Sequence, residues 1–312
     1  MRLNADKIAE FIDSQIAVWP QAAGNYEALK GVRVKEVNLP GWTVKVQFNP
    51  ARIVSSSAKV DAKSLKERKC FLCGANRPEV QEGIEWGGRY TVLINPFPIF
   101  PRHLTIPDNT HTDQLITGRI ADMVRLASEL EEYTVFYNGP RCGASAPDHM
   151  HFQAGNSDFL TLAPALEDAE LKTVATDGDA TLALVDSLPL KVFVIDTSAD
   201  EPEAAERLFD RLYKAIPVPD GEKEPMMNLL CYPTPAGVRL VVIPRKRHRP
   251  SFYGTEGEGT MLLSPASVDM GGVFITPLEK DFNALDADLI LKILDELCLS
   301  SAEINEIASN VK

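Results

Sequence analysis

The spacing of apolar residues along the chain predicts an alternation of short strands and amphipathic helices. Apolar residues recur at helical spacing in four segments, numbered 5–19, 120–130, 202–216 and 286–299. Alternating or short apolar runs between turn residues predict strands at 32–37, 42–48, 93–95, 103–106, 134–137, 190–195, 228–232 and 238–243. Residues 59–69 are charged and are predicted as a linker, whereas the pattern over 155–185 is ambiguous.

A further strand is predicted at residues 149–153, and it carries polar residues on one face. In His149-Met150-His151-Phe152-Gln153, polar and apolar residues alternate, so the three polar side chains share one face of a strand. Alternate residues on that face lie roughly 7 Å apart, at a rise of about 3.3 Å per residue. A neutral imidazole can attack phosphorus while its other nitrogen is held by a hydrogen bond, and an amide can donate to a phosphoryl oxygen. The alternative is a strand whose polar residues only face solvent.

The segment before this strand consists of small and turn-forming residues. Residues 137–148 read Tyr-Asn-Gly-Pro-Arg-Cys-Gly-Ala-Ser-Ala-Pro-Asp, and such a loop can turn several backbone N–H groups inward to bind an anion. An ordinary turn between strands is the competing interpretation. The candidate donors are Asn138, Gly139, Gly143, Ala144 and Ser145.

Together these two motifs resemble the histidine-triad (HIT) superfamily. The branch concerned contains hexose-1-phosphate uridylyltransferases, diadenosine tetraphosphate phosphorylases and GDP-hexose phosphorylases, in which the third triad position is Gln, as at Gln153. The triad hydrolases usually have a third His, so the resemblance favours nucleotidyl transfer over hydrolysis. It implies His151 as the nucleophile, with the Gln153 amide and the Ser145 hydroxyl as hydrogen-bond donors.

An earlier segment is similar to the first hairpin of the same superfamily. Residues 93–107 form a predicted strand, a proline-rich crossing and a second predicted strand, followed by His111. The resemblance implies that Asn95 and His103 lie near the nucleotide. It covers residues 70–155 with two separate motifs in matching order.

The cysteines suggest a metal site. Five cysteines in 312 residues, with no secretory leader expected, do not indicate a disulfide framework. Cys70 and Cys73 form a Cys-x-x-Cys pair, which is half of a tetrahedral zinc site, or simply two reduced thiols in a turn. The uridylyltransferase resemblance supplies His111 and His149 as the other ligands of a structural zinc. Cys142 is either a bystander or a substitute ligand, and Cys231 and Cys298 are expected in the core.

Composition and charge narrow the class of protein. A net charge of −12 argues against a nucleic-acid-binding surface, and apolar runs are too short for a membrane span. We therefore expect a cytoplasmic enzyme of anionic small molecules. The densest positive charge, residues 245–249, is either a solvated loop, a localisation signal or a phosphate subsite, with Arg245 and Arg247 as candidate substrate ligands.

The predicted fold is α+β: a HIT-like antiparallel sheet with flanking helices, duplicated within the chain. The catalytic half comprises residues 1–165 and the second half residues 166–312, in which residues 228–248 are expected to parallel residues 92–111. The predicted substrate is a nucleotide sugar or dinucleoside polyphosphate, and the acceptor is inorganic phosphate or a sugar phosphate. The alternatives are an inactive nucleotide- or sugar-phosphate-binding module and a HIT-type hydrolase; a homodimer is one option for its assembly.

Overall fold

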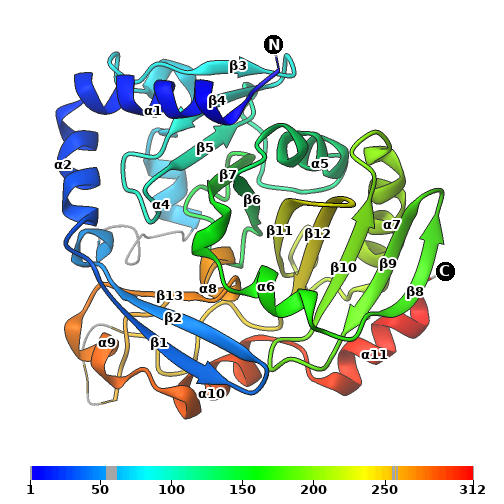
Figure 1. Cartoon of the computed structure of the whole chain (residues 1–312). Coiled ribbons are helices and arrows are strands. Elements are labelled where there is room, and N and C mark those ends of the chain that lie inside the picture. Colours follow the sequence, from blue (N-terminus) through cyan, green and yellow to red (C-terminus); the bar gives the residue numbers. More distant parts are fainter. Residues whose placement is uncertain (1, 54–61, 255–256, 258, 312) are drawn as a thin grey trace.

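The computed structural model describes residues 2–53, 62–254, 257 and 259–311, and these form a mixed α+β structure (Figure 1). The helices are α1 (Ala5–Val18), α2 (Pro20–Leu29), α4 (Ala62–Glu67), α5 (Ile120–Glu129), α6 (Leu162–Glu167), α7 (Pro202–Ala215), α8 (Ser267–Met270), α9 (Glu279–Ala284), α10 (Ala287–Leu297) and α11 (Ser301–Asn310). Short 3-10 turns are η1 (Pro50–Arg52), η2 (Gly74–Asn76) and η3 (Ser157–Phe159).

The strands of the described residues form one large and one small sheet. They are β1 (Arg33–Leu39), β2 (Trp42–Phe48), β3 (Ile84–Trp86), β4 (Tyr90–Ile94), β5 (His103–Pro107), β6 (Tyr133–Asn138), β7 (His151–Asn156), β8 (Lys172–Asp177), β9 (Ala180–Val185), β10 (Val192–Thr197), β11 (Met227–Thr234), β12 (Gly237–Pro244) and β13 (Val273–Thr276). The small sheet has the order β1-β2-β13, with β13 parallel to β2.

The large sheet shows the expected duplication. Its order is β3-β4-β5-β7-β6-β11-β12-β10-β9-β8, and every pair of neighbours is antiparallel. Counted inward from its edge, the first half reads β3-β4-β5-β7-β6 and the second half β8-β9-β10-β12-β11, so the two orders correspond. Along the chain, α5 precedes β6 and β7 as α7 precedes β11 and β12. The halves meet at the pairing of β6 with β11, where Asn138 lies opposite Asn228.

This order corrects the internal correspondence expected from sequence. The hairpin of β11 and β12 occupies the place of β6 and β7, not that of β4 and β5, because α7 precedes it as α5 precedes β6. The apolar run ending in Ile-Pro, shared by β5 and β12, reflects two buried antiparallel strands rather than equivalent positions. The predicted boundary at residue 165 falls inside α6.

Both faces of the large sheet are covered. One face packs Phe152 and Ala154 of β7 against α1, α5, α7 and α11. The other packs Phe136 of β6 and Leu230 of β11 against the small sheet and α6, α8, α9 and α10. The small sheet, with α9 and α10, lies below the large sheet in Figure 1. Because both faces are buried, the inner strands are apolar nearly throughout instead of alternating.

Most predicted elements are present with shifted ends. Residues 59–69 were predicted as a linker, but residues 62–67 form the helix α4, so that prediction is wrong there. Residues 59–61 lie outside the described residues. The helices α2 and α11 were not predicted. The strand expected at 149–153 begins at His151 and continues to Asn156, so His149 and Met150 lie in the loop before it.

Candidate active site

His151 is the first residue of strand β7, and its surroundings determine the tautomer and the protonation state of its ring. The side chain is 3% exposed, and its Nδ1 lies 2.8 Å from the carbonyl oxygen of His149. A carbonyl oxygen only accepts, so Nδ1 carries the proton and the lone pair is on Nε2. Burial lowers the pKa of His151 from 6.5 to about 4, so the ring is neutral near pH 7. A neutral imidazole with a free Nε2 is suited to act as a nucleophile.

Two residues away on the same face of β7, the Gln153 amide is oriented by the neighbouring strands. Its Oε1 is 3.1 Å from His103 Nε2 and 3.4 Å from Asn95 Nδ2. The backbone N–H of Ile99 donates to His103 Nδ1 at 3.2 Å, so Nε2 carries the proton and donates to Gln153. This arrangement directs the Gln153 NH2 group away from His103. The structure therefore brings together Asn95, His103 and Gln153. That Asn95 and His103 lie near the nucleotide stays a prediction.

Gln114, which sequence reasoning missed, holds the backbone of His151 on both sides. Its Oε1 accepts the His151 N–H at 2.7 Å, and its Nε2 donates to the His151 carbonyl at 3.0 Å. The same Nε2 donates to the Asn138 carbonyl at 3.0 Å, and the side chain is fully buried. A glutamine in a loop carries no sequence motif, so nothing in the sequence marked it.

A buried carboxylic acid from the second half supports the same region. Glu224, which precedes β11, accepts from the Tyr137 hydroxyl at 2.6 Å and from the backbone N–H of Ile116 at 3.0 Å. Tyr137 is also 3.1 Å from the Gln114 carbonyl oxygen, which links Glu224 to the residue that holds His151. Burial raises the pKa of Glu224 from 4.5 to about 7.

The loop between β6 and β7, residues 139–150, carries the predicted anion-binding positions. Gly143 has φ +101, a conformation that favours glycine. Ala144 is buried, whereas Ser145 is exposed. Gly139 lies so close to β11 that a Cβ there would be 2.7 Å from the Met227 carbonyl oxygen. Asn138 is nearly buried, and its Oδ1 accepts from the Ser267 backbone N–H at 2.8 Å.

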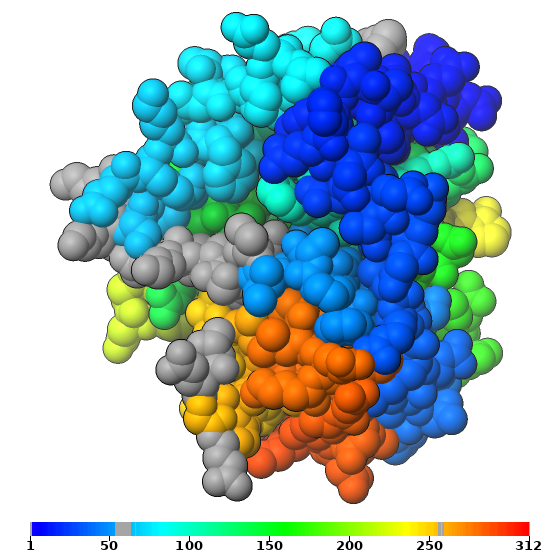
Figure 2. Space-filling view, turned by 90° about the vertical axis from the view of Figure 1, so that its left-hand side faces the viewer, coloured from blue at the N-terminus to red at the C-terminus, as the bar shows by residue number. Residues whose placement is uncertain are grey.

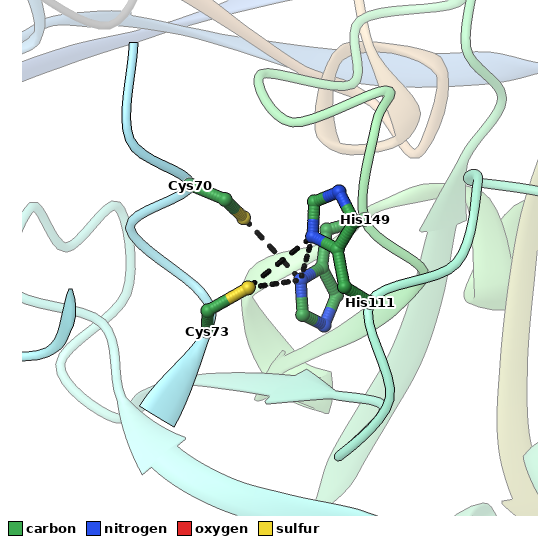
Figure 3. Close-up of side chains that lie close together, drawn as sticks. All are labelled: Cys70, Cys73, His111 and His149. Carbon is green, nitrogen blue, oxygen red and sulfur yellow. Dashed lines mark hydrogen bonds between the residues drawn. The ribbon is translucent and has the colours of Figure 1, made fainter. Parts of the chain in front are cut away.

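Cys70, Cys73, His111 and His149 converge on one point, as Figure 3 shows. Their ligand atoms all lie within 4.8 Å of one another. The Nδ1 atoms of the two histidines are 3.2 Å apart, and Cys73 Sγ is 3.2 Å from His111 Nδ1. Cys70 Sγ and Cys73 Sγ lie 3.3 Å and 3.6 Å from His149 Nδ1.

These separations fit a tetrahedral zinc site. Zinc–sulfur and zinc–nitrogen bonds of usual length give tetrahedral edges of about 3.3 Å between nitrogens and about 3.6 Å between sulfur and nitrogen. The His149 Nε2 donates to the Asp108 carbonyl at 2.8 Å, which leaves Nδ1 free to bind a metal. Asp108 is held in turn by a buried ion pair with Arg119. Cys142 is not part of this cluster, and Cys231 and Cys298 are in the core as expected.

The two candidate arginines of the basic segment are placed differently. Arg245 is 4% exposed, and its guanidinium donates to the Asn228 side chain and to three backbone carbonyls. Arg247 is exposed and pairs with Glu296 at 2.8 Å. The substrate-binding role expected of Arg245 and Arg247 stays a prediction.

Figure 2 shows the molecule from the edge that carries α1 and α2. In this view the cyan segment lies above the gold and orange C-terminal segment. The two segments are far apart in the sequence.

Comparisons with known proteins agree with this fold. Residues 11–156 match a family described as a domain of unknown function (DUF4922), and residues 166–312 match the GDPGP1-like C-terminal domain. A stretch of 116 residues, 32% of the chain, is 31% identical to diadenosine 5',5'''-P1,P4-tetraphosphate phosphorylase 2 of Saccharomyces cerevisiae. That match spans 35%, about a third, of the length of the yeast protein.

Solved structures share the fold over nearly the whole chain. The yeast Ap4A phosphorylase Apa2 in complex with AMP is similar with a TM-score of 0.65 and 19% identity, over 96% of this chain and 98% of that one. The same enzyme in complex with Ap4A is similar with a TM-score of 0.57 and 18% identity, over 90% and 97% of the two chains.

These findings confirm the resemblance to the HIT superfamily and, within it, to the branch of galactose-1-phosphate uridylyltransferases and Ap4A phosphorylases. They also confirm the duplicated α+β fold. Among the described helices, none is both long and apolar enough to cross a membrane.

Proposed function

We propose that this protein is a nucleotidyltransferase of the phosphorylase type, which acts through a nucleotidyl group carried on His151. The observation that supports it most is the state of the His151 ring. The His149 carbonyl holds Nδ1–H and leaves the Nε2 lone pair free beside the oriented Gln153 amide. The partial match to the yeast tetraphosphate phosphorylase supports the same class of reaction.

The chemistry is a double displacement. His151 Nε2 attacks the α-phosphorus of a dinucleoside polyphosphate or nucleotide sugar, forming a P–N bond as the bond to the leaving phosphate oxygen breaks. An oxygen of inorganic phosphate or of a sugar phosphate then attacks the same phosphorus, and the P–N bond breaks to regenerate His151. The hydrogen bond from His151 Nδ1–H to the His149 carbonyl oxygen is kept throughout, and it stabilises the positive charge that develops on the ring.

The remaining residues of the site would bind and orient the transferring group. The Gln153 NH2 is directed away from His103 and would donate to a non-bridging phosphoryl oxygen. Backbone N–H groups of Gly143 and Ala144, with the exposed Ser145 hydroxyl, would provide further donors from the β6–β7 loop. Asn95 and His103 would lie at the nucleotide side.

We also propose that Cys70, Cys73, His111 and His149 hold a structural zinc ion. With four protein ligands, such a site has no open position for catalysis. Its role would be to fix His149, whose side chain is a ligand and whose carbonyl oxygen accepts from His151. The metal site would therefore set the position of the atom that orients the nucleophile.

Mass spectrometry of a rapidly quenched reaction tests the proposed function. Wild-type protein mixed with Ap4A or with a nucleoside diphosphate sugar, without phosphate, should gain one nucleotidyl group that maps to the peptide containing His151. His151→Asn should show no adduct and no turnover, with an unchanged circular dichroism spectrum. Turnover by His151→Asn at the wild-type rate would refute the proposal.

The same panel separates the two alternatives. A binding module that has lost its chemistry would bind nucleotide without an adduct or exchange of labelled phosphate. A hydrolase would release nucleoside monophosphate in water and would not need phosphate as acceptor. A phosphorylase should instead show phosphate-dependent release of a nucleoside diphosphate.

A further inference from the structure

The β6–β7 loop is held from the second half by the side chain of Asn228. Asn228 lies on β11 opposite Asn138 of β6. Its Nδ2 donates to the Cys142 carbonyl at 2.8 Å and to Asn138 Oδ1 at 3.1 Å, with Ser267 Oγ at 3.2 Å. One fully buried amide thus joins both ends of the turn that begins the loop.

Arg245, the residue after β12, determines which way that amide faces. Its Nη1 donates to Asn228 Oδ1 at 2.6 Å and to the Pro265 carbonyl at 3.3 Å. Its Nη2 donates to the carbonyls of Arg247 and His248, both at 3.1 Å. Because a guanidinium group only donates, Asn228 must present its oxygen to Arg245 and its NH2 to the loop.

The loop also packs closely against residues 265–267 of the second half. A Cβ at Gly143 would lie 2.4 Å from the Ala266 Cβ, so the loop backbone and residues 265–267 are in direct contact. The Ser267 hydroxyl donates to the Tyr137 carbonyl at 2.6 Å. A shift of Asn228 or of residues 265–267 would therefore be transmitted to the loop.

We propose that Arg245 is a positioning residue of the nucleotidyl-transfer site, acting through Asn228 on the β6–β7 loop of the first half. This inference rests on the proposed function, since the loop is taken to bind the phosphoryl group. In this role the buried Arg245 orients Asn228 and does not itself contact the substrate. It also makes the second half, which lacks its own His-x-His-x-Gln motif, part of the working site.

The inference is tested with two variants that keep most of the local shape. Arg245→Lys keeps the charge but loses the two guanidinium NH2 groups that donate to Asn228 and to the three carbonyls. Asn228→Asp is nearly isosteric and keeps its contact with Arg245, but it turns an acceptor toward the Cys142 carbonyl. Arg239→Lys is the matched control, because Arg239 lies on β12, the strand that Arg245 follows, and forms a bidentate pair with Asp196.

The readout is the rate at which His151 gains a nucleotidyl group from Ap4A in a quenched reaction, measured beside the melting temperature and the KM for inorganic phosphate. Both test variants should slow adduct formation by about 10- to 100-fold, the loss usual when a residue that orients a ligand-binding group is changed. Arg239→Lys should lower the melting temperature without slowing the adduct.

Two results would overturn the inference. An unchanged adduct rate in Arg245→Lys would do so, and a raised KM for phosphate beside that unchanged rate would show that Arg245 binds the acceptor directly. Loss of folding in both test variants, with Arg239→Lys still folded, would assign the cluster to stability alone. Absence of an adduct in the wild type would instead refute the proposed function.

Discussion

Replacing Gln114 should be costly, because its side chain forms three buried hydrogen bonds with the backbone around the nucleophile. Gln114→Ala removes the acceptor of the His151 N–H and the donor to the carbonyls of His151 and Asn138. Each buried backbone group left without a partner costs about 1–3 kcal/mol. For the three groups together we therefore expect a loss of about 3–9 kcal/mol in the free energy of unfolding.

Gln114→Glu separates the loss of hydrogen bonds from the cavity left by alanine. The glutamate keeps the size and the acceptor for His151 N–H, but it sets an oxygen against two carbonyl oxygens. Its loss should be large at pH 8 and smaller at low pH, where protonation restores one donor.

Urea unfolding followed by circular dichroism measures these free energies. Gln81→Ala is the control, because Gln81 is half-buried and, among the described residues, its side chain donates one hydrogen bond, to the Ile94 carbonyl at 3.3 Å. It should lose about 0.5–1.5 kcal/mol. A Gln114→Ala variant as stable as Gln81→Ala would refute the assignment of Gln114 as the support of His151.

Two further predictions concern the metal cluster and a buried acid. Purified protein should contain about one zinc per chain, and Cys70→Ser should lower both zinc content, measured by plasma mass spectrometry, and the melting temperature; metal-free wild-type protein would refute the site. Glu224 has a pKa raised from 4.5 to about 7, so the folded state binds more protons than the unfolded state between these values. Its contribution to stability is therefore complete below about pH 4.5 and is lost as pH rises through 7, by about 3 kcal/mol. Glu224→Gln should reduce this loss between pH 5 and 8 in urea unfolding, and an unchanged pH dependence would contradict the prediction.

The sequence motifs point to the reacting and metal-ligating residues of the proposed site but not to the residues that support them. His151 and Gln153 follow from a strand of alternating polar and apolar residues, and Cys70 and Cys73 follow from the short spacing that a metal requires. Residues that act by holding backbone, such as Gln114 and Asn228, have no such spacing. Their partners are 37 and 86 residues away in the chain, so only the fold shows them.

The fold was predicted where periodicity was clear and missed where burial on both faces erased it. The helix α5 was expected from the spacing of Ile120, Met123, Val124 and Ala127, and all four are buried. By contrast, the strands β5 and β12 are buried nearly throughout, and their similar apolar runs suggested a false correspondence. Strand order in a sheet depends on contacts between distant segments, which a local pattern does not encode.

The pairing of β6 with β11 has a consequence for how the protein is synthesised. All six residues of β6 are buried, and its pairing residue Asn138 is separated from Asn228 by 90 residues. At a synthesis rate of about 5–20 residues per second, β6 leaves the ribosome about 5–20 s before its partner. During that time the first half has an apolar strand edge with unpaired backbone groups, able to pair with any exposed strand nearby. The pairing that joins the two halves can form only after β11 has been made. Until then the edge of β6 in the nascent chain is open to pairing with other strands.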